Sequence, residues 1–392
     1  MAHPTFRYKF PTEVVFGCGS RKELHQHAMP GKKCMLVISN GKSMRENGVL
    51  DEILRELAAS GVEVCVFDRV GANPTTDMVR QGVALARESG CDFVTALGGG
   101  SVIDCAKCIS LTAPQTHDIW EYAAAGTGGR RKPERPPLPL IAIPTTAGTG
   151  SEMDTIGVST NPETNEKYPI GKGMGLYPVL TVVDAEIMAS VPPRMTAYQG
   201  MDAFFHLCEG YFCSMSTPMS DMIDLHGVRL VAEYLPRAVR DGSDMEAREN
   251  MAFASSLGGY SMEFSSCTSL HAMEHALSAY HPELPHGAGL VILSEAYFAF
   301  FAEKHVLDRR FSELAAAMRG RTGEPADFME ELRKLIAACG LENLKMSDFG
   351  ITPDEFPQMV QRSYDMRNGS FSCDRYAMTP EECRSIFERA YR

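Results

Sequence analysis

The chain has 392 residues, of which 44% are hydrophobic and 22% are charged. This composition is typical of a globular protein with a large core, and the length predicts two or three domains. The formal net charge of −12 produces a surface that repels phosphate backbones, so we expect no nucleic-acid partner.

The amino-terminal residues and the cysteines indicate where in the cell the protein is expected. Residues 1–17 have no basic stretch followed by an apolar run, so they do not resemble a signal peptide. No segment approaches the roughly 20 consecutive apolar residues of a membrane span. We expect the twelve cysteines to be reduced thiols in a cytoplasmic protein, and the C-x-x-C of Cys105 and Cys108 to be structural, because no second pair completes a zinc ribbon.

The first half of the chain alternates short apolar runs with amphipathic stretches. Stretches with helical spacing follow the first three runs, at 47–60, 75–89 and 101–112. Repeated strand–helix units predict a parallel sheet with helices on both faces. The runs of strand length are 34–38, 62–67, 92–97, 137–143 and 179–183.

The pattern changes at Pro192 and Pro193. Adjacent prolines break regular structure, so we place a domain boundary after residue 192. Long helical patterns dominate beyond this point, for example over 218–239 and 289–305. The sequence therefore predicts a domain over 1–192 and a helical domain over 193–392.

A glycine-rich turn, Gly98-Gly99-Gly100-Ser101, follows the run at 92–97 and opens the next helix. Glycines permit positive φ and close approach of a ligand to the backbone. The N–H groups and dipole of a helix start favour an anion. Ser101 and Asp104 have the spacing of a capping box. The turn predicts a phosphate site, although a plain tight turn with a good N-cap has the same residues. It matches neither G-x-G-x-x-G nor a Walker A loop.

A second polar turn, "PTTAGTGSE" at 144–152, follows the run at 137–143. It supplies the hydroxyls of Thr145, Thr146 and Thr149. Ligands of open α/β sheets bind beyond the carboxyl ends of the strands. Two such turns favour one long diphosphate ligand.

Residues 271–287 hold four of the eleven histidines: His271, His275, His281 and His286. Asp202 and His206 lie earlier in the chain at i and i+4, which places them on one helix face. Together with these two, His271 and His286 form a set of one carboxylate and three imidazoles. Such donors suit zinc or ferrous iron, with an open position for water or substrate.

A competing hypothesis starts from the H-x-x-E-H spacing of His271, Glu274 and His275. In a zinc peptidase of this type the two histidines bind the metal and the glutamate is the general base. That hypothesis explains neither the glycine turn nor the Asp202–His206 pair. A non-catalytic metal- or nucleotide-binding protein is a third alternative. We expect His281 to be a solvated loop residue.

Four stretches taken together resemble the iron-containing (group III) alcohol dehydrogenases: "GGGSVIDCAK" (98–107), "PTTAGTGSE" (144–152), "GMDAFFHLCE" (200–209) and residues 271–287. The resemblance spans nearly the whole chain. It implies an α/β, Rossmann-like dinucleotide-binding domain with a parallel sheet over 1–192 and an all-helical metal-binding domain over 193–392, as in dehydroquinate synthase.

The resemblance also implies roles for individual residues. A metal, Fe²⁺ or alternatively Zn²⁺, would lie in the cleft between the domains. His275 would lie near the nicotinamide without binding the metal and could relay the alcohol proton, and Glu274 would have no catalytic duty. The implied metal ligands are Asp202, His206, His271 and His286. The implied cofactor contacts are Gly99, Gly100 and Ser101 at the pyrophosphate, and Ser39, Asn73, Thr145, Thr146, Thr149, Lys167 and His275 elsewhere.

The implied activity is that of an oxidoreductase: an NAD(P)- and metal-dependent alcohol dehydrogenase that moves a hydride between a primary alcohol or its aldehyde and nicotinamide. NAD-preferring members often carry an aspartate after the first nucleotide-domain strand. Ser39, Asn40 and Gly41 stand there instead, and Lys42 could attract a 2′-phosphate. The choice between NAD and NADP therefore stays open. The expected partners are a small alcohol or aldehyde and further copies of the chain in a homo-oligomer, with no membrane.

Overall fold

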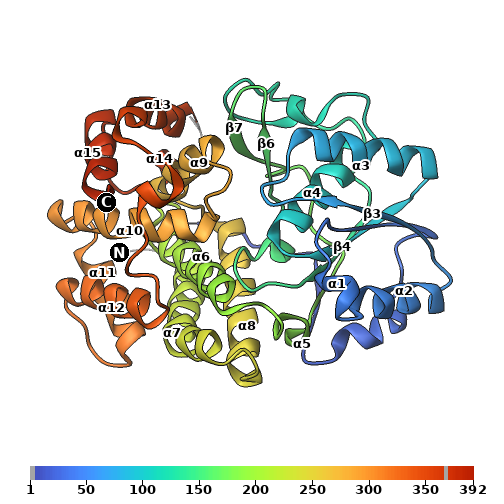
Figure 1. The fold of residues 1–392 in the computed structure, drawn as a ribbon, viewed down its shortest axis with the longest axis horizontal. Helices are drawn as coiled ribbons and strands as arrows, with labels where there is room; N and C mark the ends of the chain where they lie inside the picture. The colour runs from blue at the N-terminus through green and yellow to red at the C-terminus, as the bar shows by residue number, and fades with distance from the viewer. Residues whose placement is uncertain (1–4, 366–369) are drawn as a thin grey trace. The chain divides into compact units, whose positions relative to one another are not determined.

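The computed structural model describes residues 5–365 and 370–392, and the chain forms two compact units (Figure 1). The first contains Lys9–Thr146 and Gly150–Ser190. The second, helical unit contains 5–8, 147–149 and Val191–Arg392. The chain passes between the units two residues before the predicted boundary. Nothing in the sequence indicated that 5–8 and 147–149 group with the helical unit.

The first unit is built on a six-stranded sheet in which all pairings are parallel, as predicted. The strand order is β1-β8-β5-β4-β2-β3. Five strands coincide with the predicted apolar runs, and β1 was not among them. The bounds are β1 Glu13–Phe16, β2 Lys33–Ser39, β3 Glu63–Val70, β4 Phe93–Gly98, β5 Leu140–Pro144 and β8 Leu180–Val183.

The central strands are apolar because both faces of the sheet are covered. Leu36 of β2 packs in one core cluster with Ile53 and Leu57 of α2 (Val49–Ala59). The next residue along the strand, Val37, points to the opposite face and is also buried. Continuous apolar runs are the signature of such doubly covered parallel strands.

The other predicted helices of this unit are α3 (Thr76–Ser89) and α4 (Gly100–Thr112). An antiparallel hairpin of β6 (Gly157–Asn161) and β7 (Glu166–Ile170) was not predicted. The short elements are η1 Ser20–Gln26, α1 Ser43–Glu46, η2 Ile119–Tyr122, η3 Ser151–Met153 and α5 Ala185–Met188.

The second unit is helical, as predicted. Pro193 is the first residue of α6, where its missing N–H has no intrahelical partner to lose. Among the described residues, no helix combines the length and apolar character needed to cross a membrane. The long helices are α6 Pro193–Phe212, α7 Pro218–Arg240, α8 Met245–Phe264, α9 Ser269–Tyr280, α10 His286–Glu303, α11 Asp308–Arg319, α12 Pro325–Ala338, α13 Phe356–Asp365 and α15 Pro380–Ala390. The short elements are η4 Met346–Phe349, η5 Pro353–Glu355 and α14 Ser370–Cys373.

Helix α6 lies in the core of this unit. Its residues Phe205 and Phe212 pack against Phe298 of α10, and Phe212 also contacts Phe311 and Phe328. Every residue from Gly200 to Cys213 is buried. A helix held on all sides in this way gives its polar side chains fixed positions.

Candidate metal and nucleotide sites

The four predicted metal ligands converge in the helical unit. Asp202 and His206 lie one turn apart on α6, His271 lies on α9, and His286 is the first residue of α10. Asp202 Oδ1 is 3.6 Å from His271 Nε2, 3.7 Å from His206 Nδ1 and 3.5 Å from His286 Nε2. Three imidazoles therefore surround one carboxylate oxygen.

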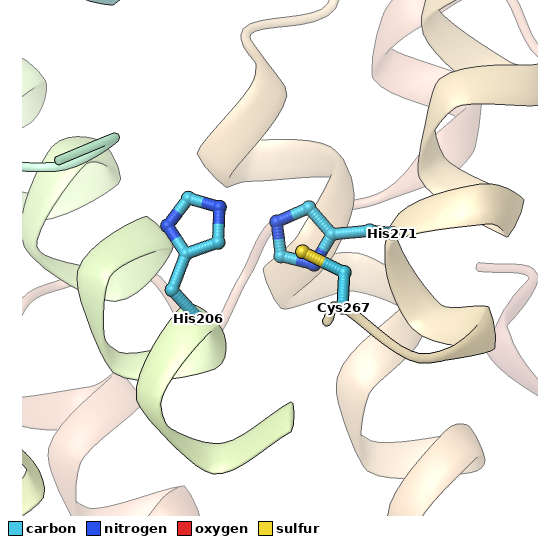
Figure 2. A group of neighbouring side chains, drawn as sticks. All are labelled: His206, Cys267 and His271. Carbon is cyan, nitrogen blue, oxygen red and sulfur yellow. The ribbon is translucent and has the colours of Figure 1, made fainter. Parts of the chain in front are cut away.

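The described residues contain three overlapping triads of possible metal donors. One is Asp202, His271 and His286, and a second is Glu274, His275 and His286. The third is His206, Cys267 and His271, which Figure 2 shows. Within each triad the ligand atoms lie within 4.8 Å of one another. Two nitrogen donors of a tetrahedral zinc ion are about 3.4 Å apart when each bond is about 2.1 Å. The spacing around Asp202 Oδ1 is close to this value.

Buried polar atoms at the site support a cation. Asp202 Oδ1, His206 Nδ1 and His271 Nε2 are buried and have no hydrogen-bond partner among the described residues. Such atoms are costly unless something binds them. A divalent cation accepts electron pairs from all three at once, so the residues fit a metal ion of the zinc or ferrous type.

Carboxylates behind two histidines determine which nitrogen faces the site. His271 Nδ1 is 2.5 Å from Glu209 Oε1, and Glu209 Oε2 also accepts hydrogen bonds from the amide and hydroxyl of Thr268. His286 Nδ1 donates to Glu274 Oε2. Both carboxylates are fully buried. A ligand histidine whose other nitrogen binds a carboxylate has its tautomer and ring orientation fixed.

The hydrogen bond to His286 gives Glu274 a positioning role, which the expectation of no catalytic duty did not include. Glu274 orients a predicted ligand across the contact between α9 and α10. It also weakens the peptidase hypothesis, because a general base must be able to reach a water molecule and this carboxylate is buried against His286.

Two glycines allow α10 to approach its neighbours. A Cβ on Gly287 would lie 2.1 Å from the carbonyl oxygen of Tyr198 on α6. A Cβ on Gly289 would lie 2.8 Å from Cγ of Glu274 on α9. The sequence "PHGAG" therefore brings His286 to the site by close helix packing.

The remaining two histidines of the 271–287 stretch lie in different places. The ring of His275 is 5.4 Å from that of His286 and 6.3 Å from that of His271, between centroids. His281 caps the end of α9, and its Nε2 is 2.9 Å from Glu355 Oε1. His281 is thus held by a carboxylate, whereas we expected a solvated residue.

The charges of the site are strongly coupled. Burial alone would raise the pKa of Asp202, but the imidazoles of His206, His286 and His271 outweigh burial and hold that pKa well below its usual range. Burial alone would lower the pKa of His206, but the carboxylate of Asp202 raises it to about 9. The site attracts positive charge, and a metal ion must displace protons to enter it.

In the first unit, the two polar turns lie side by side. Gly98 of β4 pairs with Pro144 of β5, and Thr145 N donates to Gly98 O at 3.0 Å. A Cβ on Gly99 would lie 2.9 Å from Thr146 Oγ1. Thr149, in contrast, groups with the helical unit.

The start of α4 differs from the predicted turn in two ways. No glycine of the turn has positive φ; Gly99 has φ −75°. Glycine is needed because Thr146 leaves no room for a side chain. Gly99 is the N-cap without a side-chain hydrogen bond, and Asp104 accepts from Ser151 Oγ at 2.6 Å. The predicted capping box of Ser101 and Asp104 is therefore wrong, and no side chain caps the helix start.

The turn lies where the strand order reverses. The chain runs from β2 outward to β3, returns to β4 beside β2, and continues to β5 on the other side. Ligands of such sheets bind outside the carboxyl ends of the strands at this reversal. Ser39 ends β2 and Gly98 ends β4. Asn73, with φ 51°, accepts a 3.1 Å hydrogen bond from Lys167 Nζ.

Comparison with known proteins matches both units to one family. Residues 11–185 match the model of iron-containing alcohol dehydrogenase, and residues 196–391 match the C-terminal model of the same family. The chain belongs to the iron-containing alcohol dehydrogenase family. It is therefore related to oxidoreductases that act on alcohols, as the sequence resemblance predicted.

Individual relatives support the family assignment. A 1,3-propanediol dehydrogenase from Klebsiella pneumoniae is 32% identical over 100% of both chains. A probable NADH-dependent butanol dehydrogenase from Bacillus subtilis is 30% identical over 93% of this chain and 94% of its own length. The solved structure of an archaeal halo-thermophilic alcohol dehydrogenase from a Red Sea brine pool has a TM-score of 0.91 and 30% identity, covering 100% of both chains.

Two residues near the predicted metal ligands escaped sequence prediction. Glu209 lies seven residues after Asp202, and an acidic residue on a largely apolar helix face was the available signal. Cys267 lies four residues before His271 but outside α9. Helical spacing did not apply to it, so no pattern separated it from the other cysteines.

Proposed function

We propose that this protein is an NAD(P)- and metal-dependent alcohol dehydrogenase that transfers a hydride between a primary alcohol or its aldehyde and nicotinamide. The observation that carries the proposal is the convergence of His206, His271 and His286 on Asp202 Oδ1, with buried donor atoms that have no partner in the described part of the chain. Family membership supplies the reaction class.

Asp202, His206, His271 and His286 would hold the metal, ferrous iron or zinc. When bound, a divalent ion supplies the Lewis acidity that stabilises negative charge on the alcohol oxygen. Asp202 contributes one negative charge, and neutral imidazoles contribute none. A divalent ion held by this set would therefore keep a net positive charge to stabilise the alcohol oxygen. Glu209 and Glu274 keep His271 and His286 in the tautomer with Nε2 toward the ion.

His275 is the proposed proton relay. Its ring lies beside that of His286 without belonging to the Asp202-centred set, and only 9% of the residue is exposed. An imidazole can accept the hydroxyl proton as the hydride leaves, directly or through a water molecule. The proton returns by the same route when an aldehyde is reduced.

The cofactor would bind at the carboxyl edge of the sheet. The start of α4 offers backbone N–H groups and a helix dipole to the pyrophosphate at Gly99, Gly100 and Ser101. Nicotinamide supplies the hydride acceptor. The other proposed contacts are Ser39, Asn73, Thr145, Thr146, Thr149 and Lys167.

Both NAD and NADP are compatible with this edge. The Bacillus subtilis relative is named as NADH-dependent. Here no acidic side chain follows β2 at Ser39, Asn40 or Gly41, and the exposed Lys42 offers a positive charge to a 2′-phosphate. The two cofactors must therefore be compared directly.

A substrate panel tests the proposal. Primary alcohols and diols are assayed with NAD and with NADP, and the aldehydes with NADH and NADPH, in protein supplied with ferrous iron under anaerobic conditions. We expect turnover of a primary alcohol–aldehyde pair that is lost with a chelator and restored by metal. Peptide hydrolysis without NADH or NADPH binding would instead support the metallohydrolase; cofactor and metal binding without any turnover would support a non-catalytic protein.

A further inference from the structure

Cys267 places a thiol beside the metal ligands. It lies in the short connection between α8 and α9, four residues before His271. Figure 2 shows the sulfur projecting from this connection toward the rings of His206 and His271. These two rings stack with centroids 4.5 Å apart and an interplanar angle of 18°. The thiol and the two imidazoles can therefore serve a common ion.

The other surroundings of the thiol do not explain its position. Its hydrogen-bond partner is the thioether of Met262, 3.3 Å from Sγ, and thioethers are weak acceptors. Among the candidate metal-binding groups found in the described residues, the only cysteine is Cys267. Over residues 5–365 and 370–392, the remaining cysteines are distributed over both units and form no disulfide.

Only one ion can use His271 at a time. Its Nδ1 is hydrogen bonded to Glu209 Oε1, which leaves Nε2 as the donor for either triad. Nε2 is buried, and no hydrogen-bond partner for it lies in the part of the chain that the structure describes. The triad with Asp202 and His286 and the triad with His206 and Cys267 are therefore alternatives that share this atom.

The two triads differ in chemical softness. Carboxylate oxygen suits harder cations, whereas thiolate sulfur favours zinc and other thiophilic ions. We propose that Cys267 is a metal ligand in this chain, and that its thiolate joins His206 and His271 to bind a thiophilic divalent cation such as zinc. Harder cations use the predicted set of Asp202, His206, His271 and His286. This inference rests on the proposed metal site but assigns a ligand outside the predicted four.

Cobalt(II) is the probe for a thiolate ligand, because sulfur-to-cobalt charge transfer adds an intense near-ultraviolet band that nitrogen and oxygen ligands do not produce. The full-length protein is freed of metal with a chelator, and cobalt(II) is titrated to one equivalent. We expect the band in the wild-type protein and its loss in Cys267→Ser, while the weaker visible bands of bound cobalt remain. Cys65→Ser is the matched control, because Cys65 is also partly exposed but lies on β3.

Metal affinity gives a second measurement. Loss of a thiolate should weaken zinc binding by about tenfold or more, a range typical for changes around metal sites. Binding of manganese(II), a harder ion, should change much less in Cys267→Ser. An equal loss of affinity for zinc and for manganese(II) would overturn the assignment, because it would indicate structural damage.

The outcomes separate this inference from the proposed function. Cobalt visible bands without the charge-transfer band in the wild-type protein would leave the four-residue site intact and overturn Cys267 as a ligand. Absence of cobalt binding, or cobalt binding that His271→Ala leaves unchanged, would contradict the proposed metal site itself. The wild-type spectrum decides both points if Cys267→Ser does not fold.

Discussion

Glu274 on α9 accepts a hydrogen bond from Nδ1 of His286 on α10. The bond joins a buried carboxylate to a proposed metal ligand across the contact of two helices. We expect Glu274→Gln to lower metal affinity by about 10–100-fold. A neutral amide makes Nε2 of His286 a less basic metal ligand than a carboxylate does, and it fixes the orientation of the ring less firmly. Equilibrium dialysis measures this. Glu283→Gln, at an exposed position in the same stretch, is the control, and an equal loss there would contradict the assigned role.

His271→Ala and His286→Ala should each abolish bound metal and metal-dependent turnover. Each removes a nitrogen that lies 3.6 Å or 3.5 Å from Asp202 Oδ1. The metal content after dialysis and the rate with added ferrous iron are the measurements. Full activity in either variant would remove that residue from the ligand set.

His275→Ala should behave differently from the ligand variants. We expect kcat to fall by about 100-fold or more, in the range for loss of a general acid–base group. Bound metal should stay near the wild-type level, because His275 is outside the Asp202-centred set. Loss of metal together with kcat would favour the H-x-x-E-H ligand set of His271 and His275.

Gly99→Ala should weaken cofactor binding. The added Cβ would lie 2.9 Å from Thr146 Oγ1, so either the turn at the start of α4 or the Thr146 side chain must shift, and both are proposed to contact the cofactor. We expect the Kd for NADH or NADPH, followed by fluorescence, to rise about tenfold or more, a cost of about 1.4 kcal/mol. Gly258→Ala, whose Cβ would have only ordinary contacts starting at 3.4 Å, should leave the Kd unchanged. An unaltered Kd in Gly99→Ala would show that the cofactor does not use this turn.

Asp374 should make stability depend on pH. Burial raises its pKa to about 8, although Ser269 N and the hydroxyl of Tyr297 donate to its Oδ1. Between about pH 4 and 8 the folded protein holds a proton that the unfolded chain releases, so this residue's contribution to stability falls as pH rises. Asp374→Asn is the reference variant, because it keeps an acceptor oxygen for Ser269 N and the Tyr297 hydroxyl but cannot titrate.

The measurement is the free energy of unfolding in urea at about pH 5 and about pH 8.5. From about pH 5 to about pH 8.5, the free energy of unfolding of the wild-type protein should fall by roughly 2 kcal/mol or more relative to that of Asp374→Asn. One pKa unit corresponds to about 1.4 kcal/mol. Parallel curves for the two proteins would show that Asp374 is not buried as a neutral acid.

Much of the fold followed from local patterns. The apolar runs that became β2, β4 and β5 are buried on both faces, so their composition alone marked them as central strands. Strand β1 and the hairpin of β6 and β7 were missed. Strand β1 has four residues with an exposed pattern, and β7 buries Glu166 and Lys167. The apolar part of β1 is only three residues long, and charged residues stand within β7, so neither strand forms an apolar run of the length that marks a central strand.

By itself, the amino-acid sequence determined the parallel sheet, the helical second half and the family, because hydrophobic periodicity and ordered motifs are properties of neighbouring residues. It also named the residues that meet at Asp202 Oδ1. Only the tertiary structure decided that Glu274 and Glu209 bond to two of the proposed ligand histidines, that Gly99 is packed against Thr146 without positive φ, and that Cys267 lies beside His206 and His271. Those relationships depend on how closely helices and turns approach one another. That distance is set by packing between segments far apart in the chain, which spacing along the sequence does not encode.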